Sequence, residues 1–171
     1  MLTESLLQEF ERESATTRRV LERVPQDRLT WKPHAKSMSL GTLALHIASG
    51  PGVLSQWALQ DQTEATGDFA PPEATSTSAV LAAHDEGVIT TKAALSKLGD
   101  AGLMQDWKLT TKDGTTIMGM PKVALVRSVI LNHMYHHRGQ LSVYLRLLDV
   151  PVPSIYGPSA DENPFATPAT V

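Results

Sequence analysis

The stretch LNHMYHHRGQ, residues 131–140, holds three of the six histidines of this 171-residue chain. His133 and His137 are four residues apart, so on an α-helix their side chains leave the same face. Two imidazoles placed in this way can share one divalent metal ion. The same spacing also arises where two polar residues fall in register on a helix by chance, so the rest of the chain has to decide between the two interpretations.

The histidine pair lies within an apolar stripe that predicts a helix over residues 121–148. With a spacing of three to four residues, the stripe contains Val126, Ile130, His133, His137, Leu141, Tyr144 and Leu148. Both histidines therefore take positions that would otherwise belong to the core. Burying imidazoles costs free energy unless both ring nitrogens have partners. A metal on one nitrogen and a hydrogen bond on the other would supply those partners.

The same spacing predicts three further helices, over residues 2–24, 39–60 and 77–98. Pro25 is expected to end the first, Ser39 to cap the second and Gly99 to end the third. Gly50-Pro51-Gly52 predicts a kink rather than a break, because the apolar repeat continues past it. Without any alternation of strands and helices, the pattern indicates an all-α four-helix bundle in a single domain, residues 1–171.

Two connections and a tail complete the expected fold. Residues 61–78 form a long loop rich in Thr, Pro and Ala. Residues 107–118 contain Asp113-Gly114, a turn signal that predicts a small β-hairpin before the last helix. Residues 149–171 contain five prolines and predict a Pro-rich C-terminal tail without helix, part of which (152–157) is expected to lie across the mouth of the bundle.

Composition narrows the function classes. Cysteine is absent, so any thiol chemistry must use a thiol from outside the chain. The net charge is −3 with both signs intermixed, and without a Lys/Arg cluster we expect no nucleic-acid partner. No run of about 18 apolar residues predicts a membrane span. The amphipathic, acidic N-terminus lacks the pattern of a signal peptide, so we expect a cytoplasmic protein.

Three segments taken together resemble the DinB/YfiT-like family of metal-binding four-helix bundles, not the DNA polymerase that shares the DinB name. They are LTWKPHAKSMSLGTLALHIA (29–48), HMYHHRGQL (133–141) and RLLDVPVPSIYG (146–157). The resemblance covers nearly the whole chain. It implies an up-down-down-up bundle with a long crossover, and a homodimer.

The resemblance also implies a divalent metal held by one histidine of the second helix and two of the fourth. On this chain they are His46, His133 and His137. Zinc or nickel is the first expectation, and manganese or iron is the alternative. Judged on the residues alone, His46 is a lone histidine at the edge of an apolar face, where a packed core residue is the commoner outcome.

Three neutral imidazoles leave coordination positions open, as in catalytic sites. Characterised relatives suggest a thiol-dependent transferase, in which a low-molecular-weight thiol such as bacillithiol or mycothiol attacks a small electrophile. A second hypothesis is metal-dependent hydrolysis, with His136, Asp161 or Glu162 as general acid or base. A third is a non-catalytic homodimeric bundle that binds metal or a small ligand. The sequence identifies no catalytic residue beyond these candidates.

Three further side chains each have two interpretations. Arg138 either touches substrate or pairs with another group at the helix surface or an interface. Gln140 either supports a metal ligand as a hydrogen-bond donor or lies on the surface. His84 is expected to be a packed or partly exposed histidine rather than a ligand.

Overall fold

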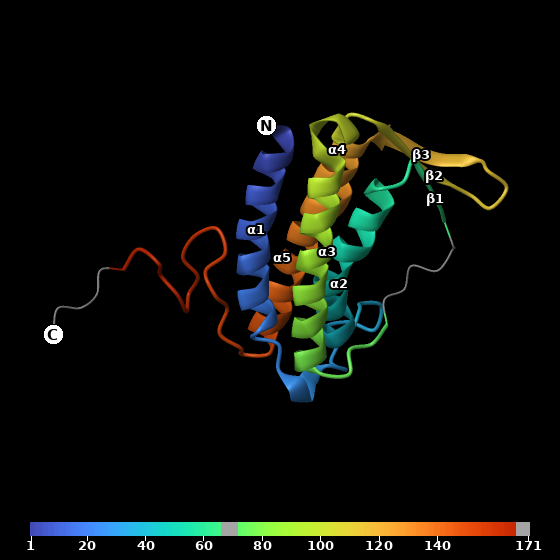
Figure 1. Cartoon of the computed structure of the whole chain (residues 1–171). Coiled ribbons are helices and arrows are strands. Elements are labelled where there is room, and N and C mark those ends of the chain that lie inside the picture. The colour runs from blue at the N-terminus through green and yellow to red at the C-terminus, as the bar shows by residue number, and fades with distance from the viewer. Residues whose placement is uncertain (66–71, 167–171) are drawn as a thin grey trace.

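The computed structural model describes residues 1–65 and 72–166, and it is mostly helical with one small sheet. Its long helices are α1 (Leu2–Leu21), α2 (Leu40–Ala58), α3 (Thr77–Leu103) and α5 (Asn132–Leu147). Figure 1 shows them side by side, with α2 and α3 running opposite to α1 and α5. The predicted helical class is confirmed. The predicted loop 61–78 extends partly outside the described residues.

The last helix is less regular than predicted. A short α4 (Lys122–Leu125) leads into the π-helical turn η2 (Val126–Leu131), and α5 follows without a break. A π-turn accommodates one extra residue in a helix, and such turns occur frequently at functional sites. This one ends two residues before His133.

α2 begins at the predicted capping residue, whereas α3 extends beyond its predicted end. Ser39 caps α2 as expected, because its side-chain oxygen accepts a hydrogen bond from the Thr42 amide. The expected stop at Gly99 is confirmed in its local geometry, because this residue has φ 59° and ψ −178° and leaves the helical conformation. Glycine tolerates positive φ. The unpredicted part of α3 is a further helical turn, which follows this kink and ends at Leu103. The first helix ends at Leu21, slightly before the predicted boundary.

The predicted hairpin is present and forms part of a larger sheet. β2 (Asp106–Thr110) and β3 (Thr116–Pro121) pair antiparallel, and the unpredicted strand β1 (Gln62–Glu64) pairs parallel to β2. Trp107 attaches the sheet to the bundle. Its side chain is buried, stacks on Trp57 and donates a hydrogen bond to the Thr63 hydroxyl.

Most of the buried hydrophobic residues belong to two main clusters. One contains Leu21, Leu43, Ile47 and Leu145 with their neighbours, and the other contains Phe10, Leu95, Ile130 and Met134 with theirs. Fully burying each such side chain stabilises the fold by roughly 1.5–3 kcal/mol.

Beyond α5, the described part of the tail contains no helix or strand. Val152 packs into the first core cluster. Asp161 and Glu162 form ion pairs with Arg146 and Arg19, which attaches this segment to α5 and α1.

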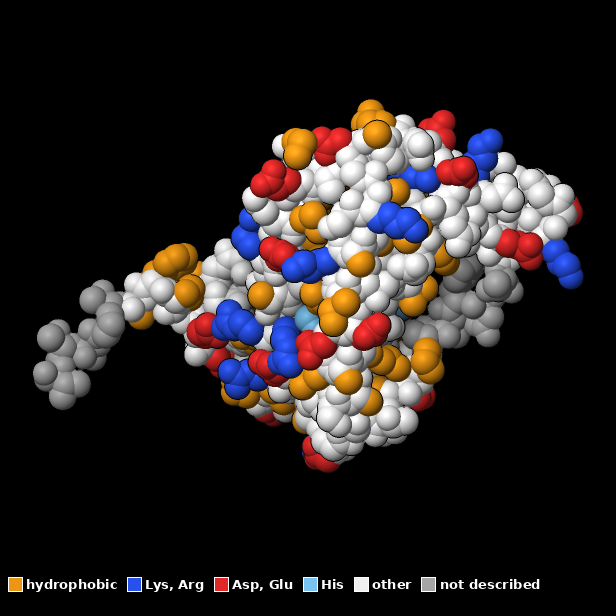
Figure 2. Space-filling model, viewed as in Figure 1, with side chains coloured by type: hydrophobic (Ala, Val, Ile, Leu, Met, Phe, Trp, Pro, Cys, Tyr) orange, Lys and Arg blue, Asp and Glu red, His pale blue; other side chains and the backbone are white. Residues whose placement is uncertain are grey.

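Charged side chains of both signs are intermixed on the face shown in Figure 2. Within residues 1–65 and 72–166, no helix has the length and apolar character needed to cross a bilayer.

Small residues allow α2 and α3 to approach closely. A methyl group added at Gly52 would lie 2.9 Å from the Cα of Gly87, and one added at Gly87 would lie 2.8 Å from the carbonyl oxygen of Ala48. These neighbours are backbone atoms, which cannot move aside as a flexible side chain can. Gly50 has a different role, because it precedes Pro51 and the absence of a Cβ relieves the clash that disfavours helix before proline.

We predict that Gly52→Ala lowers the free energy of unfolding by about 1–3 kcal/mol, because the added methyl overpacks the α2–α3 contact. The matched control is Gly139→Ala in α5, where a new Cβ meets open space. This control should raise the free energy by about 0.5–1 kcal/mol. Urea unfolding of both variants provides the measurement. Equal stability of the two variants would contradict the close approach of α2 and α3.

Candidate metal centre

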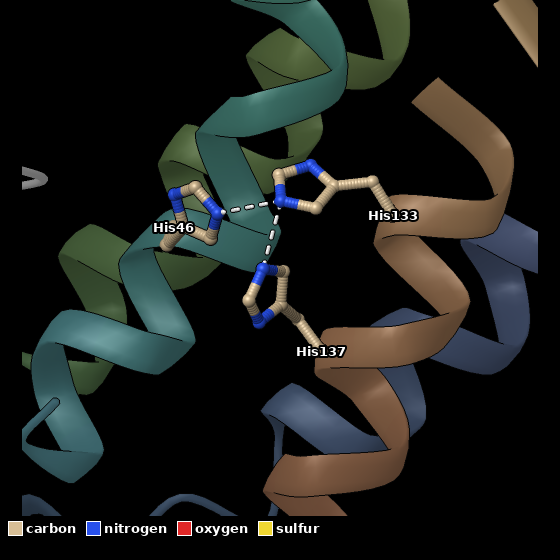
Figure 3. A group of neighbouring side chains, drawn as sticks. All are labelled: His46, His133 and His137. Atoms are coloured by element: carbon tan, nitrogen blue, oxygen red, sulfur yellow. Dashed lines mark hydrogen bonds between the residues drawn. The ribbon is translucent and has the colours of Figure 1, made fainter. Parts of the chain in front are cut away.

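The site is formed by two helices that are far apart in sequence. His46 projects from α2, and His133 and His137 project from successive turns of α5 (Figure 3). The Nε2 atom of His133 lies 3.3 Å from that of His46 and 2.8 Å from that of His137. The candidate ligand atoms all lie within 4.8 Å of one another. The structure therefore brings together the three histidines that the sequence singled out.

The local structure of α2 fixes the position of His46. The first amides of this helix, those of Leu40 and Gly41, donate to the carbonyl oxygens of Trp31 and Leu29, both at 2.8 Å. The connector thus satisfies amides that a helix start leaves without partners. Together with the Ser39 cap, these contacts anchor α2 one to two turns before His46.

The distances fit the coordination of a divalent cation. Nitrogens about 2.05 Å from a zinc ion lie roughly 3.3 Å apart in tetrahedral geometry and roughly 2.9 Å apart in octahedral geometry. The two measured Nε2 separations fall at these values. A set of three imidazoles suits zinc, nickel, iron or copper and does not distinguish among them.

The protonation of the rings also favours a cation at their shared centre. The Nδ1 atom of His137 lies 2.8 Å from the Oε1 atom of Gln140, so Nδ1 carries the proton and Nε2 presents a lone pair. The Nε2 atom of His133 faces both other rings, and a single proton there can serve only one of them. A cation accepts all three lone pairs, so the residues present fit a metal.

Burial keeps the three rings neutral. It lowers the pKa of His46 to about 4, and the neighbouring His137 and His133 lower this pKa further. The pKa values of His133 and His137 are lowered too, mainly by burial and then by neighbouring histidines, although the Gln140 hydrogen bond opposes the shift for His137. Metal ligation requires the deprotonated imidazole, so the site is suited to bind a cation at neutral pH.

Arg138 fixes the rotation of α5. It pairs with another group, as one of its two interpretations predicted, but it does so in the interior and not at the surface. The side chain is 1% exposed and points toward α1. Its Nη2 atom lies 2.6 Å from the Glu13 carboxylate and 2.7 Å from the Tyr156 hydroxyl, and Nη1 lies 3.1 Å from the Thr17 hydroxyl. Successive helix residues point about 100° apart. With Arg138 held against α1, the adjacent His137 faces α2.

A small cavity adjoins the three rings. It has a volume of about 10 Å³, enough for about one water molecule. Besides the histidines, its lining consists of Ile47, Gly50, Pro51, Leu54, Ile130 and Met134. Gly50 and Pro51 remain inside a single helix, so the unusual Gly-Pro-Gly sequence forms part of the cavity wall without interrupting α2.

The proposed acid–base candidates differ in their placement. His136 is exposed beside His137, with ring centroids 4.8 Å apart. Asp161 and Glu162 do not line the cavity, and both are engaged by arginines and by backbone amides of the tail. Neither carboxylate therefore belongs to the lining of the cavity beside the three histidines. The Ser159 hydroxyl accepts hydrogen bonds from the backbone amides of Asp161 and Glu162, which fixes both residues in a local turn of the tail.

His84 and Gln140 complete the comparison with the sequence. His84 is buried on α3 and hydrogen-bonds through Nδ1 to Asp85, outside the ligand group, as its packed interpretation predicted. Gln140 does contact a candidate ligand, but its Oε1 atom accepts a hydrogen bond from His137 and does not donate one.

Comparison with known proteins agrees with this geometry. The sequence model of the DinB family matches residues 1–165. The chain belongs to the DinB family. It is 27% identical over 160 residues to the uncharacterized protein YrdA of Bacillus subtilis (strain 168), covering 91% of this chain and 89% of YrdA.

Solved DinB-like structures share the fold of this DinB family member. One from Bacillus cereus ATCC 10987 superposes with a TM-score of 0.69 at 26% identity, covering 90% of this chain and 97% of that one. The DinB-like protein YjoA of Bacillus subtilis has a TM-score of 0.66 at 20% identity, covering 86% and 95%. Because YjoA is 20% identical to this chain, its similarity shows a shared fold and nothing more.

We predict that Gln140→Leu weakens metal binding about 10–100-fold, because the His137 ring loses the acceptor that fixes its orientation. The control is Gln8→Leu, on the exposed face of α1. Competition with a chromogenic chelator measures both affinities. Unchanged affinity in Gln140→Leu would mean that this hydrogen bond does not orient the ligand.

We predict that the metal-free protein loses stability as the pH falls from about 6.5 toward 4. The folded-state pKa values of the triad lie below the ordinary histidine value, so the unfolded chain binds more protons in this range. The contribution of the neutral histidines to the free energy of unfolding is complete above the histidine pKa of the unfolded chain. It is lost as the pH falls toward the lower pKa values of the folded protein. Denaturant unfolding at several pH values measures this loss, which should be smaller in His46→Gln than in His34→Gln, a change at an exposed site. An equal loss of stability in both variants would show that the buried histidines do not cause the pH dependence.

Proposed function

We propose that this protein is a divalent-metal-dependent enzyme that transfers a low-molecular-weight thiol to a small electrophile. The observation that carries the proposal is the convergence of three neutral imidazoles from two helices. The described residues contribute no fourth His, Cys, Asp or Glu to the group. An open coordination position is typical of catalytic sites, whereas structural zinc sites are closed by four protein ligands.

A divalent ion bound there would act as a Lewis acid and lower the pKa of a bound thiol or water. His46, His133 and His137 would hold the ion through their Nε2 atoms, and Gln140 keeps the proton of His137 on Nδ1. The apolar side chains of Leu54, Ile130 and Met134 restrict water at the cavity. The proton released by the thiol can leave through the exposed His136 or directly to solvent.

Hydrolysis is the alternative, and one observation makes it the weaker of the two. A hydrolase needs a positioned general acid or base to move protons to and from the substrate. The cavity lining includes no carboxylate, and His136 is the remaining candidate from the sequence. A thiolate nucleophile, once ionised, attacks a soft electrophile without further proton transfer at the protein.

The wider context of the site remains part of the proposal. The helix directions in Figure 1 support an up-down-down-up bundle of the family type. The family resemblance supports a homodimer, and the absence of cysteine is compatible with the cytoplasm. Zinc or nickel is the first choice of metal, with manganese or iron next. A non-catalytic metal-binding bundle is the outcome if no turnover is found.

We predict that His133→Ala abolishes thiol-dependent turnover of a chromogenic electrophile, with a loss on the order of 100-fold or more, because the site loses its central ligand. His34→Ala, which changes an exposed histidine of the connector, should keep full activity and full metal content. Elemental analysis of protein prepared without a His-tag accompanies the assay. Turnover of an ester without thiol would instead establish the hydrolase. No bound metal before or after loading would exclude both activities.

A further inference from the structure

The cavity beside the three histidines has no charged lining. Its buried floor is formed by Ile47, Pro51, Ile130 and Met134, and the half-buried Leu54 lies at its edge. The volume of about 10 Å³ accepts about one small donor atom. The group attached to that atom must therefore lie outside the cavity, where Leu54 is the apolar side chain of the lining that remains partly exposed.

The helices that carry this surface are uncharged well beyond the cavity. α2 (Leu40–Ala58) contains no Asp, Glu, Lys or Arg. Residues 128–137, which lead through the π-turn to the second ligand of α5, contain none either. The charged residues that flank this second stretch are turned toward α1, since Arg127 pairs with Glu9 and Arg138 pairs with Glu13.

A charge on the incoming ligand would lose water at this surface without finding a partner among the lining residues. The ion at the three histidines would attract an anion, but the thiolate sulfur would already neutralise one of its two positive charges. Removing a charged group from water is costly unless it is paired and hydrogen-bonded. An uncharged apolar substituent has the opposite preference, because its contact with Leu54 removes apolar surface from water.

We propose that the ligand completing this site carries an uncharged, apolar substituent next to its donor atom, and that Leu54 determines this specificity. The inference rests on the proposed function, because it requires a metal at the three histidines and a donor that enters the open position. It adds the chemical class of the ligand.

The experiment uses the full chain loaded with cobalt(II), which reports thiolate binding through a sulfur-to-metal absorption band. Three thiol probes of similar length are titrated: 1-butanethiol, 2-mercaptoethanesulfonate and thiocholine. They are neutral, anionic and cationic next to the sulfur. The expected result is that butanethiol binds about tenfold more tightly than either charged probe, a ratio equivalent to about 1.4 kcal/mol.

Variants test the role of Leu54. Leu54→Lys should remove the preference for butanethiol over the sulfonate, because the new ammonium group pairs with the anion. Val53→Lys is the matched control: Val53 is 56% exposed and does not line the cavity, so the preference should persist. Leu54→Ala adds no charge. It should weaken the binding of butanethiol and so bring its affinity closer to those of the two charged probes. Circular dichroism confirms that each variant is folded.

The outcomes separate the inference from the proposed function. Equal affinities for the three thiols, or tightest binding of the sulfonate by the unchanged protein, overturn the inference while leaving thiol binding intact. If Leu54→Lys and Val53→Lys show the same preference for butanethiol over the sulfonate, Leu54 does not determine the specificity. The absence of a sulfur-to-cobalt band with every thiol, in protein that retains cobalt, contradicts the proposed function itself.

Discussion

The rotation of α5 about its axis is the constraint on which the site depends. Two adjacent residues of this helix face different neighbours, because Arg138 contacts α1 and His137 faces α2. Burying a guanidinium costs several kcal/mol, and the Glu13 carboxylate and the Thr17 hydroxyl offset that cost. Removing one partner from such a pair typically destabilises a protein by about 3–5 kcal/mol. Any rotation that moved the histidines would also break this pair.

Both helices that form the cavity depart from regular α-helix at its wall. Pro51 has no amide proton, so the carbonyl of Ile47 lacks its usual partner within α2. On the other side, the π-turn Val126–Leu131 includes Ile130. Such irregularities cost stability and persist where the surrounding packing fixes them. Here Ile47 belongs to one core cluster and Ile130 to the other, so the site lies where the two clusters meet.

The sequence predicts those features that local patterns determine. The apolar spacing predicts the long helices, and Ser39 predicts the start of α2 because capping depends on a single side chain. The HxxxH spacing alone predicts one face of the site, but the family resemblance was needed to select His46 on another helix. The hairpin follows from Asp113-Gly114, which sets a turn within four residues.

What the sequence misses depends on contacts between distant residues. Strand β1 has three residues, and its pairing with β2 closes a connection of about forty residues that no local pattern specifies. Arg138 has a charged side chain of the kind that usually lies at the surface. Its burial is possible because Glu13 on α1 lies where it can pair with the guanidinium. The stop signal of Gly99 is obeyed locally, but no local pattern predicts the further helical turn beyond it, which places Leu103 in the core. In each case contacts between distant residues decide the outcome.

Charge balance connects the fold to the chemistry. The three candidate ligands are neutral imidazoles, and neither α2 nor the segment 128–137 carries a carboxylate, so a divalent ion held there would keep its full charge in a weakly polar setting. At low dielectric that charge would strongly favour an anionic donor in the open position. A neutral thiol that ionised on binding would supply one negative charge at the sulfur and none elsewhere. The same surroundings that disfavour a second charge on the ligand therefore favour the ionisation that makes it a nucleophile, which supports thiol transfer over a reaction that depends on proton exchange with protein carboxylates.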